Sequence, residues 1–411
     1  MKKSIIAIIA IVSIAIIAIF LFGNINTQTE IITGDGTTFP ATDVGFQNAL
    51  TYTETQSPEV STITLPPKEI EIDVMYYITQ DNLEIIGTSN WNSKTTLNFV
   101  NHTVWYDEKV WGWRACRPYP EYNAGRLEVE WSMKSMEFYK CKNIYMQDIT
   151  FTGASNLRFV IEENANIHLN NVDFIDIDRP FTHHGDYGSW HSTCAFESDT
   201  GTLLSGDVLV ENCDIIRSTN WGWVPFIRGQ DATMENFVFR NCTAFRCGMP
   251  VNGVPIIDWY DNGVRETNNW QNWSIGFGIT ESYWAPTSLV PTSRNFTYEY
   301  CIAEENRESG FHSEYRAVED NIVFKNCKSN RNGQKWISQG YELGYNPRDD
   351  GKIAYSSGWL GFPDDRYDDQ LINCEANDNF LYGYWRSGSS SIYETQMTGC
   401  TASGNGISDY I

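Results

Sequence analysis

Short segments in which apolar and polar residues alternate recur through most of this chain. A period of two is typical of β-strands that bury one face. Several of these segments end in a turn residue, in most cases Asn or Gly, followed by a cysteine. The cysteines in this position are Cys213, Cys242, Cys301, Cys327, Cys374 and Cys400. Ile149 and Val172 close two earlier segments of the same kind, so one structural unit repeats along the chain.

Each unit holds three short strands, and the third often begins with Gly followed by an aromatic residue. These third strands are predicted at residues 157–163, 194–198, 224–228, 276–280, 310–314, 340–344 and 383–386. Three short strands per repeat predict a parallel β-helix, whose equivalent residues stack about 4.8 Å apart from coil to coil. In this register the six cysteines form one column inside the coil, where small apolar side chains fill a narrow turn.

The chain begins with a different pattern, an apolar run from Ile5 to Phe22 that follows two lysines. A helix of this length measures roughly 27 Å, close to the thickness of the apolar layer of a bilayer. No clear cleavage site follows, so residues 1–23 are predicted to be a signal anchor with a single transmembrane helix, and residues 24–33 a short linker. The alternative is a cleaved signal peptide. The first interpretation places the rest of the chain at the cell surface, and the second makes it a secreted protein.

Four further motifs lie ahead of the repeats: Gly34-Asp-Gly36, Phe46-Gln-Asn-Ala-Leu50, Thr64-Leu-Pro-Pro67 and Leu83-Glu-Ile-Ile-Gly87. Together with the repeats they resemble the opening of the right-handed pectin-lyase-like β-helix superfamily. The resemblance implies an all-β fold over residues 34–411: a right-handed parallel β-helix with an N-terminal capping segment and long loop insertions. It does not choose an activity, because this superfamily includes lyases, hydrolases, epimerases, phage tailspikes and adhesins. The catalytic motifs of polygalacturonases and pectate lyases are absent.

The charge of the chain narrows the class of partner. With 52 Asp and Glu against 29 Lys and Arg, the net charge is −23. Binding of nucleic acid needs a basic surface, so a nucleic-acid partner is excluded. The same charge favours a neutral or cation-bridged glycan over a bare polyuronate.

Aromatic residues gather in segments that interrupt the repeats, at about residues 101–131, 178–192, 248–275 and 345–370. Aromatic rings stack on the apolar faces of sugars, so these insertions are predicted to line a glycan-binding groove. The candidates for substrate binding, in the insertions or close to them, are Trp113, Trp221, Trp223, Trp259, Tyr260, Trp270 and Trp284. The alternative is that the rings pack the insertions onto the β-helix as small satellite cores.

The third strands also suggest a catalytic surface. If their aromatic residues point inward, one outward column reads Glu162, Glu197, Arg228, Thr280 and Glu314, and a second column two residues earlier includes His312 and Glu342. Carboxylates one coil apart would have the spacing of a retaining glycosidase, and two coils apart that of an inverting one. Arg228 would neutralise these acids or hold a substrate carboxylate. The alternatives are a solvated ladder of ion pairs or a register shifted by one residue, which would bury the column.

Two other segments carry candidate chemistry. Half of the six histidines lie at residues 183–191, where His184 and Asp186 are candidates for an acid, a base or a metal ligand. Asp pairs at 349–350, 364–365 and 368–369 are candidates for Ca²⁺ ligands, although turn formation is the commoner role of such pairs. No Cys-x-x-Cys motif predicts a metal site, and disulfides stay open for the cysteines outside the column.

The sequence therefore supports two hypotheses. The first is a membrane-anchored surface enzyme that cleaves a polysaccharide as a hydrolase or lyase. The second is a non-catalytic adhesin or envelope scaffold that binds glycans. The first requires that the carboxylates, Arg228, His312 and the Trp-rich insertions converge on one side of the coil, whereas scattered positions favour the second.

Overall fold

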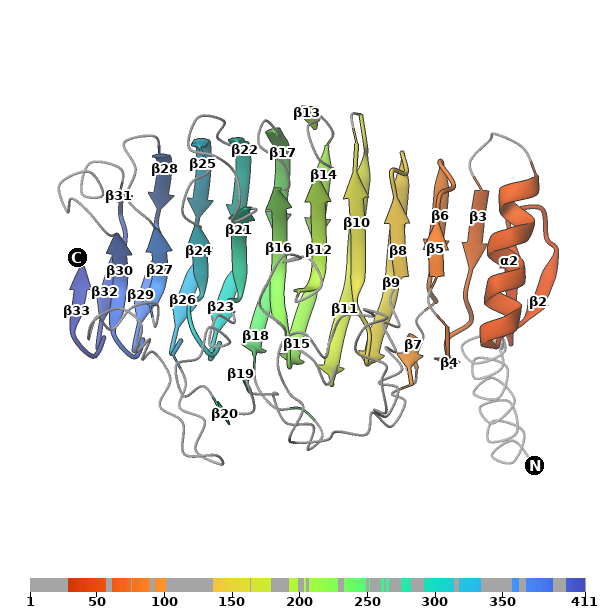
Figure 1. Cartoon of the computed structure of the whole chain (residues 1–411), viewed down its shortest axis with the longest axis horizontal. Coiled ribbons are helices and arrows are strands. Elements are labelled where there is room, and N and C mark those ends of the chain that lie inside the picture. Colours follow the sequence, from red (N-terminus) through yellow and green to blue (C-terminus); the bar gives the residue numbers. More distant parts are fainter. Residues whose placement is uncertain are drawn as a thin grey trace, which may run out of the picture.

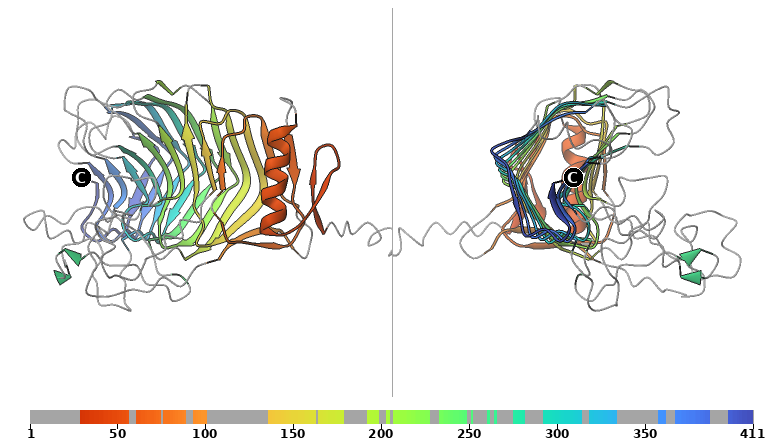
Figure 2. Two further views of the ribbon diagram at one scale, coloured as in Figure 1. Left: turned by 45° about the vertical axis from the view of Figure 1, so that its right-hand side comes forward. Right: turned by 90° about the vertical axis from the view of Figure 1, so that its left-hand side faces the viewer.

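The chain folds as a parallel β-helix whose coils stack along one axis (Figures 1 and 2). The computed structural model describes residues 29–56, 61–74, 76–88, 93–100, 136–162, 164–178, 192–198, 203–204, 207–227, 233–248, 251, 260–261, 264–265, 275–281, 292–313, 318–333, 357–361, 367–386 and 397–410. Each coil contributes strands to three faces of the helix, as the three-strand repeat predicted. Seen along the axis, the strands of successive coils lie over one another (Figure 2).

The third face is a continuous ten-stranded parallel sheet. From the N-terminal end its strands are β5 (Tyr76–Ile78), β8 (Met136–Tyr139), β10 (Leu157–Ile161), β12 (Ser192–Ser198), β16 (Trp221–Ile227), β21 (Phe277–Glu281), β24 (Phe311–Ser313), β27 (Ser357–Gly361), β30 (Tyr382–Arg386) and β33 (Ser408–Tyr410).

The first and second faces form one larger sheet that bends at a corner, because β9 (Ile144–Gly153) and β11 (Ile167–Ile177) run across both. The other strands of the first face are β3 (Ser61–Thr64), β6 (Leu83–Ile86), β14 (Val208–Glu211), β17 (Thr233–Arg240), β22 (Thr292–Glu299), β25 (Val318–Lys325), β28 (Tyr367–Ile372) and β31 (Met397–Thr398). Those of the second face are β4 (Glu69–Ile72), β7 (Thr95–Phe99), β15 (Asp214–Ser218), β18 (Thr243–Cys247), β23 (Ile302–Glu304), β26 (Lys328–Asn330), β29 (Glu375–Asn377) and β32 (Thr401–Ser403). Outside this pattern, β13 (Leu203–Leu204) pairs with β17, and β19 (Tyr260–Asp261) pairs with β20 (Val264–Arg265).

The corner between the first two faces depends on the residue before each cysteine. Asn212, Asn241, Asn326 and Asn373 all adopt a positive φ there, between 53° and 56°. Asn tolerates this left-handed conformation better than most residues, which explains its recurrence in the repeat. Tyr300 occupies the same position with a φ of 57° and is 54% exposed.

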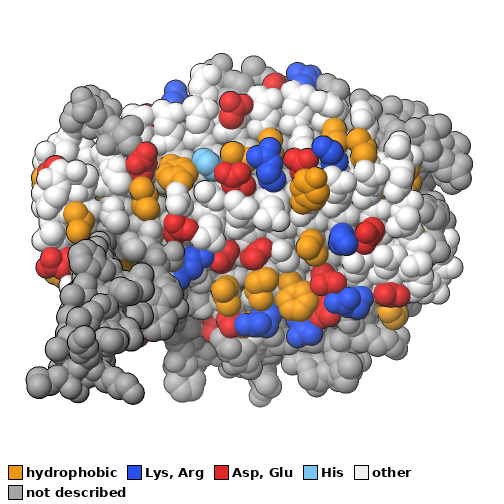
Figure 3. All heavy atoms as spheres, turned by 180° about the vertical axis from the view of Figure 1, so that it is seen from behind, with side chains coloured by type: hydrophobic (Ala, Val, Ile, Leu, Met, Phe, Trp, Pro, Cys, Tyr) orange, Lys and Arg blue, Asp and Glu red, His pale blue; other side chains and the backbone are white. Residues whose placement is uncertain are grey.

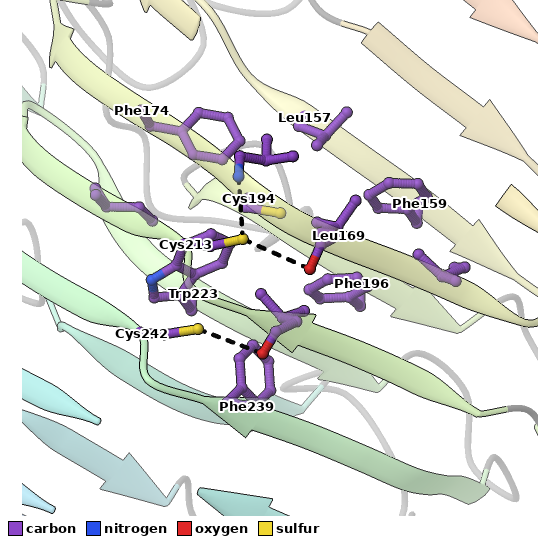
Figure 4. Close-up of a cluster of buried hydrophobic side chains, with 14 of the residues drawn as sticks. Leu157, Phe159, Leu169, Phe174, Cys194, Phe196, Cys213, Trp223, Phe239 and Cys242 are labelled. Atoms are coloured by element: carbon purple, nitrogen blue, oxygen red, sulfur yellow. Dashed lines mark hydrogen bonds between the residues drawn. The ribbon is translucent and has the colours of Figure 1, made fainter. Parts of the chain in front are cut away.

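The six repeat cysteines are free thiols that occupy one turn position on the inner side of the coil, as predicted. Figure 4 shows two of them, Cys213 and Cys242, among buried aromatic and aliphatic side chains. The Cys213 thiol donates to the carbonyl of Leu169 at 3.6 Å, and the Cys242 thiol to that of Val210 at 3.4 Å. The predicted role as small interior fillers fits this arrangement. Cys141, Cys194 and Cys247, outside the column, are also free, so no disulfide links the cysteines that the structure describes.

Aromatic rings fill the interior behind the third face. Phe277 stacks on Phe311 at 5.0 Å between ring centroids, Phe311 on Trp359 at 4.8 Å, and Trp359 on Tyr384 at 5.0 Å. Trp359 belongs to β27, which lies between β24 and β30. The prediction that residues 340–344 form this strand was wrong, because Trp359 supplies the aromatic ring at this level of the stack. The predicted position of Glu342 in the outward column was wrong for the same reason.

A second interior ladder consists of asparagines at the turn that leads into the third face. Nδ2 of Asn306 donates to Oδ1 of Asn332, and the same bond links Asn332 to Asn379 and Asn379 to Asn405, each at 3.0 Å. Asn306, Asn332 and Asn379 are at most 1% exposed. The ladder therefore satisfies buried amide groups that would otherwise destabilise the core.

The N-terminal end of the core is closed by the helix α2 (Asp43–Thr55) and the hairpin of β1 (Glu30–Thr33) and β2 (Thr38–Pro40). Phe46 of the helix is fully buried, and its ring meets that of Tyr76 edge-on at 5.0 Å. This confirms the capping helix that the resemblance implied. Strand β1 lies inside the predicted linker at residues 24–33, and its Ile31 is part of the core.

The predicted anchor at residues 1–23 lies outside the described residues. Among those that are described, no helix has the length and apolarity to cross a membrane. Most of the four predicted insertions also lie outside the described part of the chain, although β27 and the start of β28 fall inside the range predicted for the last one.

The outer surface of the first face carries charges that alternate from coil to coil. Glu211, Arg240, Glu299 and Lys325 are paired in register, with N to O distances of 3.6, 3.5 and 3.0 Å along the row. The bond from Lys325 and its positive charge lower the pKa of Glu299. From behind, acidic and basic side chains are seen in rows across the molecule (Figure 3). These exposed pairs contribute little stability each, but they prevent like charges from stacking.

We expect the native fold to protect its thiols. In a Cys116→Ala variant nine cysteines remain, and all except Cys400 are buried. Burial raises the pKa of thiols such as those of Cys213 and Cys301, so both access and reactivity are lost. An aromatic disulfide reagent should modify at most Cys400 in the native protein and all nine cysteines in guanidinium chloride. Rapid modification of several native thiols would contradict the interior column.

We also expect Asn332→Ala to destabilise the fold by roughly 2–5 kcal/mol, since it removes the acceptor of the buried backbone N–H of Asn306 and the donor to the buried carbonyl of Ala303. Denaturant unfolding measures the loss. Asn98→Ala is the matched control, because the amide of Asn98 donates to the exposed Glu69, and its loss should cost less than about 1 kcal/mol. Equal losses in the two variants would show that the ladder is not a special source of stability.

Candidate functional site

Each insertion joins the end of a second-face strand to the start of a third-face strand. Residues 101–135 precede β8, 179–191 precede β12, 266–274 precede β21 and 334–356 precede β27. All of these segments lie outside the described residues, so the position of their aromatic side chains stays a prediction. Because each insertion is followed by a third-face strand, the chain order brings its C-terminal end to an edge of that face.

Two outward columns run along the third face. The first contains Tyr77, Glu137, Arg158, Ala195 and Val224 on successive strands. It continues through Gly278, His312 and Leu360. The second, two residues later on each strand, contains Tyr139, Val160, Glu197, Phe226 and Thr280. Ionisable residues thus lie on either side of a stretch, from Ala195 to Gly278, that is small or apolar.

Near the N-terminal end of these columns, Arg158 lies between two carboxylates. Its Nε and Nη2 donate to Oε2 of Glu197 at 2.8 and 2.5 Å, and its Nη1 donates to Oε2 of Glu137 at 2.7 Å. All three side chains are less than 10% exposed. Burial by itself would lower the pKa of Arg158, but the charges of Glu197 and Glu137 outweigh it and raise that pKa. The guanidinium therefore stays charged, and we call this group the buried triad.

The predicted catalytic column is correct in placing Glu197 and Thr280 in one column and wrong in giving Glu162 and Arg228 positions beside Glu197. The residues that pair with Glu197 are Val160 and Phe226. On β10, Phe159 pairs with Phe196 in the interior, which leaves Val160 beside Glu197, and on β16 the interior Trp223 pairs with Cys194, which leaves Phe226 there. Glu162 does not join the triad but forms an ion pair with Lys140 at 2.5 Å.

His312 lies in the first outward column, on β24, and is buried. Its Nδ1 is 3.5 Å from Oε1 of the buried Glu308 and 3.4 Å from Oγ of Ser309. Three strand spacings separate β24 from β12, or roughly 14 Å, so His312 and Glu197 cannot act on the same bond as a direct pair. The face thus holds two separate polar clusters.

The predicted substrate-binding aromatics have mixed outcomes. Trp223 was wrongly assigned, because it is fully buried and its indole N–H donates to the carbonyl of Thr243 at 3.0 Å. Trp221 is half-buried at the start of β16, paired with Ser192. Tyr260 is described only as part of the β19 backbone. Trp113, Trp259, Trp270 and Trp284 lie outside the described residues.

The remaining predicted acids and bases also fall outside the described part: His184, Asp186, Arg228, Glu314 and Glu342. The same holds for the Asp pairs at 349–350 and 364–365, and the side chains of the pair at 368–369 are not described. No cluster of three or more His, Cys, Asp or Glu side chains that could hold a metal occurs among the described residues. The Ca²⁺ prediction is therefore untested.

Sequence reasoning missed Glu137, Arg158 and Glu308. The first two had a detectable signal, since each is the one charged residue in an otherwise apolar third-face strand. Glu308 lies in a turn and only the fold brings it to His312.

Comparisons with known proteins add little beyond this. No protein-family model matches the chain, and no curated protein sequence matches it. Among solved structures, the GH136 lacto-N-biosidase from Eubacterium ramulus is similar with a TM-score of 0.38 and 8% identity, over 88% of this chain and 64% of that one. A periplasmic alginate epimerase, AlgG, has a TM-score of 0.27 and 7% identity, over 87% and 79%. The catalytic domain of a GH87 α-1,3-glucanase has a TM-score of 0.21 and 8% identity, over 85% and 61%.

We expect Arg158→Met to destabilise the protein by about 3–5 kcal/mol, because two buried carboxylates lose their cation. The deficit should shrink as the pH falls, since a protonated carboxyl needs no counter-charge. Denaturant unfolding at several pH values measures both effects. Arg294→Met is the control: Arg294 pairs with Glu235 at 3.6 Å but is 44% exposed, so its loss should cost below about 1 kcal/mol. A pH-independent deficit would show that the triad's charges are not its cause.

Proposed function

We propose that this protein acts on a polysaccharide at the outer surface of its third face, and that it cleaves the chain as a hydrolase or lyase. The observation that carries the proposal is the set of buried ionisable side chains on the outward side of that face. The buried triad and the His312–Glu308 pair both lie on the third face, which the aromatic-rich insertions adjoin in sequence.

The composition supports a sugar as the substrate. A net charge of −23 disfavours polyanions, while 15 Trp, 22 Tyr and 21 Phe supply many rings for stacking. Neutral sugars need apolar faces together with hydrogen-bonding groups, and they carry no charge that this acidic surface would repel. A neutral polysaccharide is therefore the proposed substrate class, and on it hydrolysis is the favoured reaction, because elimination needs the acidic C5 proton of a uronate.

Two carboxylates of the third face are the proposed catalytic groups. Glu197 is the proposed base, and its carboxylate is held in place by Arg158. Glu162, on the neighbouring strand's C-terminal side, is the proposed second carboxyl group. The mechanism would be that of an inverting glycosidase, in which one carboxylate activates water and the other group donates a proton.

The second candidate function is a non-catalytic surface protein that binds glycans. One observation favours it: the Glu197 side chain is only 1% exposed and both of its contacts with Arg158 are short. A carboxylate held in this way can serve as a clamp between β10 and β12 without touching a substrate. In that case the charged groups of the third face would stabilise the coil, and the insertions alone would bind the glycan.

The proposed location is the cell surface. It depends on the apolar run from Ile5 to Phe22, which has the length of a transmembrane helix. The secreted form remains the alternative, and either location would expose the β-helix to extracellular polysaccharides.

The proposal predicts that the full-length protein cleaves at least one of laminarin, mannan, xylan and amylose. Glu197→Gln should lower kcat by about 10²–10⁴-fold and leave glycan binding intact. Reducing-end release detects hydrolysis, and ultraviolet absorbance of an unsaturated product detects elimination.

Glu137→Gln is the matched control, because it removes the other carboxylate of Arg158 and so carries a similar cost in stability. Only Glu197→Gln should lose turnover. Equal loss of kcat in both variants would assign Glu197 a structural role. A wild-type protein that binds these polysaccharides but cleaves none would favour the non-catalytic candidate.

A further inference from the structure

An exposed pair of stacked tyrosines lies beside the buried triad. Tyr77 is 57% exposed, and its ring stacks on that of Tyr139 with 5.5 Å between centroids and 29° between planes. Within the described part of the chain, large hydrophobic side chains with this exposure are few: Val44, Tyr77, Tyr300 and Ile407. The ring of Tyr77 is held in its orientation by this aromatic partner.

The register places this pair next to the charged groups. Tyr77 is the neighbour of Glu137 on the adjacent strand, and Tyr139 lies in the same outward column as Glu197. The first charged residue beyond Tyr139 is Lys140, whose ammonium lies 5.2 Å from the Tyr139 ring and forms the ion pair with Glu162. An exposed flat ring and a set of hydrogen-bonding groups therefore share one end of the third face.

This combination matches the chemistry of a sugar ring. A pyranose presents a face of C–H bonds that packs on an aromatic ring, and a rim of hydroxyls that bond to charged and polar groups. Tyr77 offers the ring, and the Lys140–Glu162 pair offers both a donor and an acceptor, with side chains that are 30% and 36% exposed. Because stacking on Tyr139 limits the motion of Tyr77, little conformational entropy is lost on binding.

The local charge selects the kind of sugar. The residues around the platform include three carboxylates, Glu137, Glu162 and Glu197, and two cations, Lys140 and Arg158. Both cations are already paired with carboxylates at 2.5–2.7 Å. A uronate or sulfated sugar would meet an excess of negative charge, whereas a neutral sugar would not.

We propose that Tyr77, stacked on Tyr139, is the platform of a subsite that binds a neutral hexose or pentose unit of a polysaccharide at the N-terminal end of the third face. The proposal rests on the proposed function, which it deepens by naming a binding residue and a substrate class. Tyr77 positions the glycan by contact, and the proton-transfer groups are other residues.

Affinity electrophoresis of the full chain tests the platform, with laminarin, mannan, xylan or amylose in the gel and polygalacturonate as the acidic probe. The Glu197→Gln variant serves as the background, so that turnover does not consume the probe. Tyr77→Ala should weaken binding to the retarding neutral polysaccharide by roughly tenfold or more, and Tyr77→Phe should retain it, because stacking needs the ring and not the hydroxyl.

Tyr300→Ala is the matched control, since Tyr300 has nearly the same exposure but lies on the corner of the first and second faces. It should bind as the parent does. If Tyr77→Ala also binds as the parent, the platform is refuted while the proposed function stands. If the parent binds polygalacturonate alone, the substrate class is refuted. If it binds no polysaccharide, both proposals fail. If instead Tyr77→Ala changes only the oligomeric state in light scattering, the exposed ring is a contact between copies of the chain.

Discussion

Parallel stacking of coils is the constraint on which the rest of this structure depends. Each strand pairs with its equivalent in the next coil, so every side chain lies directly over the side chain at the same position of the previous coil. A position in the repeat thus becomes a column that runs along the molecule. Inside, the columns hold residues that stack favourably: free thiols, aromatic rings and hydrogen-bonded asparagines, such as Asn332 with Asn379. A single residue out of place would affect two coils.

On the outside of the coil, the same stacking brings charged side chains of successive coils close together. Like charges one strand apart would repel, and the first face avoids this with an alternation in which Arg240 lies between Glu211 and Glu299. The third face repeats that solution in a buried setting, with Arg158 between Glu137 and Glu197. The two faces differ in the effective dielectric constant around their ion pairs. On the exposed face an ion pair contributes little, whereas in the triad the loss of one charge leaves two others desolvated. Within the described residues, the third face is therefore where outward charges are buried and depend strongly on each other.

The candidate site follows from where the insertions join this framework. The four long insertions each lead into a strand of the third face. That face keeps a small and apolar middle, at Ala195 and Val224, between its two polar clusters. The exposed Tyr77 beside the triad adds a surface suited to a sugar ring. The proposed function combines these features, and it depends on chemistry at one end of the face rather than on a contact between Glu197 and His312.

The sequence by itself determined the β-helix, its capping helix and the cysteine column, because a repeat of period two specifies strands, inner faces and turns locally. Asn before Cys was enough to locate the corner at Asn212 and its equivalents. The tertiary structure alone decided the register between third-face strands, which depends on how bulky side chains share the interior. Trp223 enters the core and shifts the column of Glu197, and Trp359 selects β27. It also decided that Arg158 joins two acids from strands distant in sequence, since no local pattern records which residues become neighbours across coils.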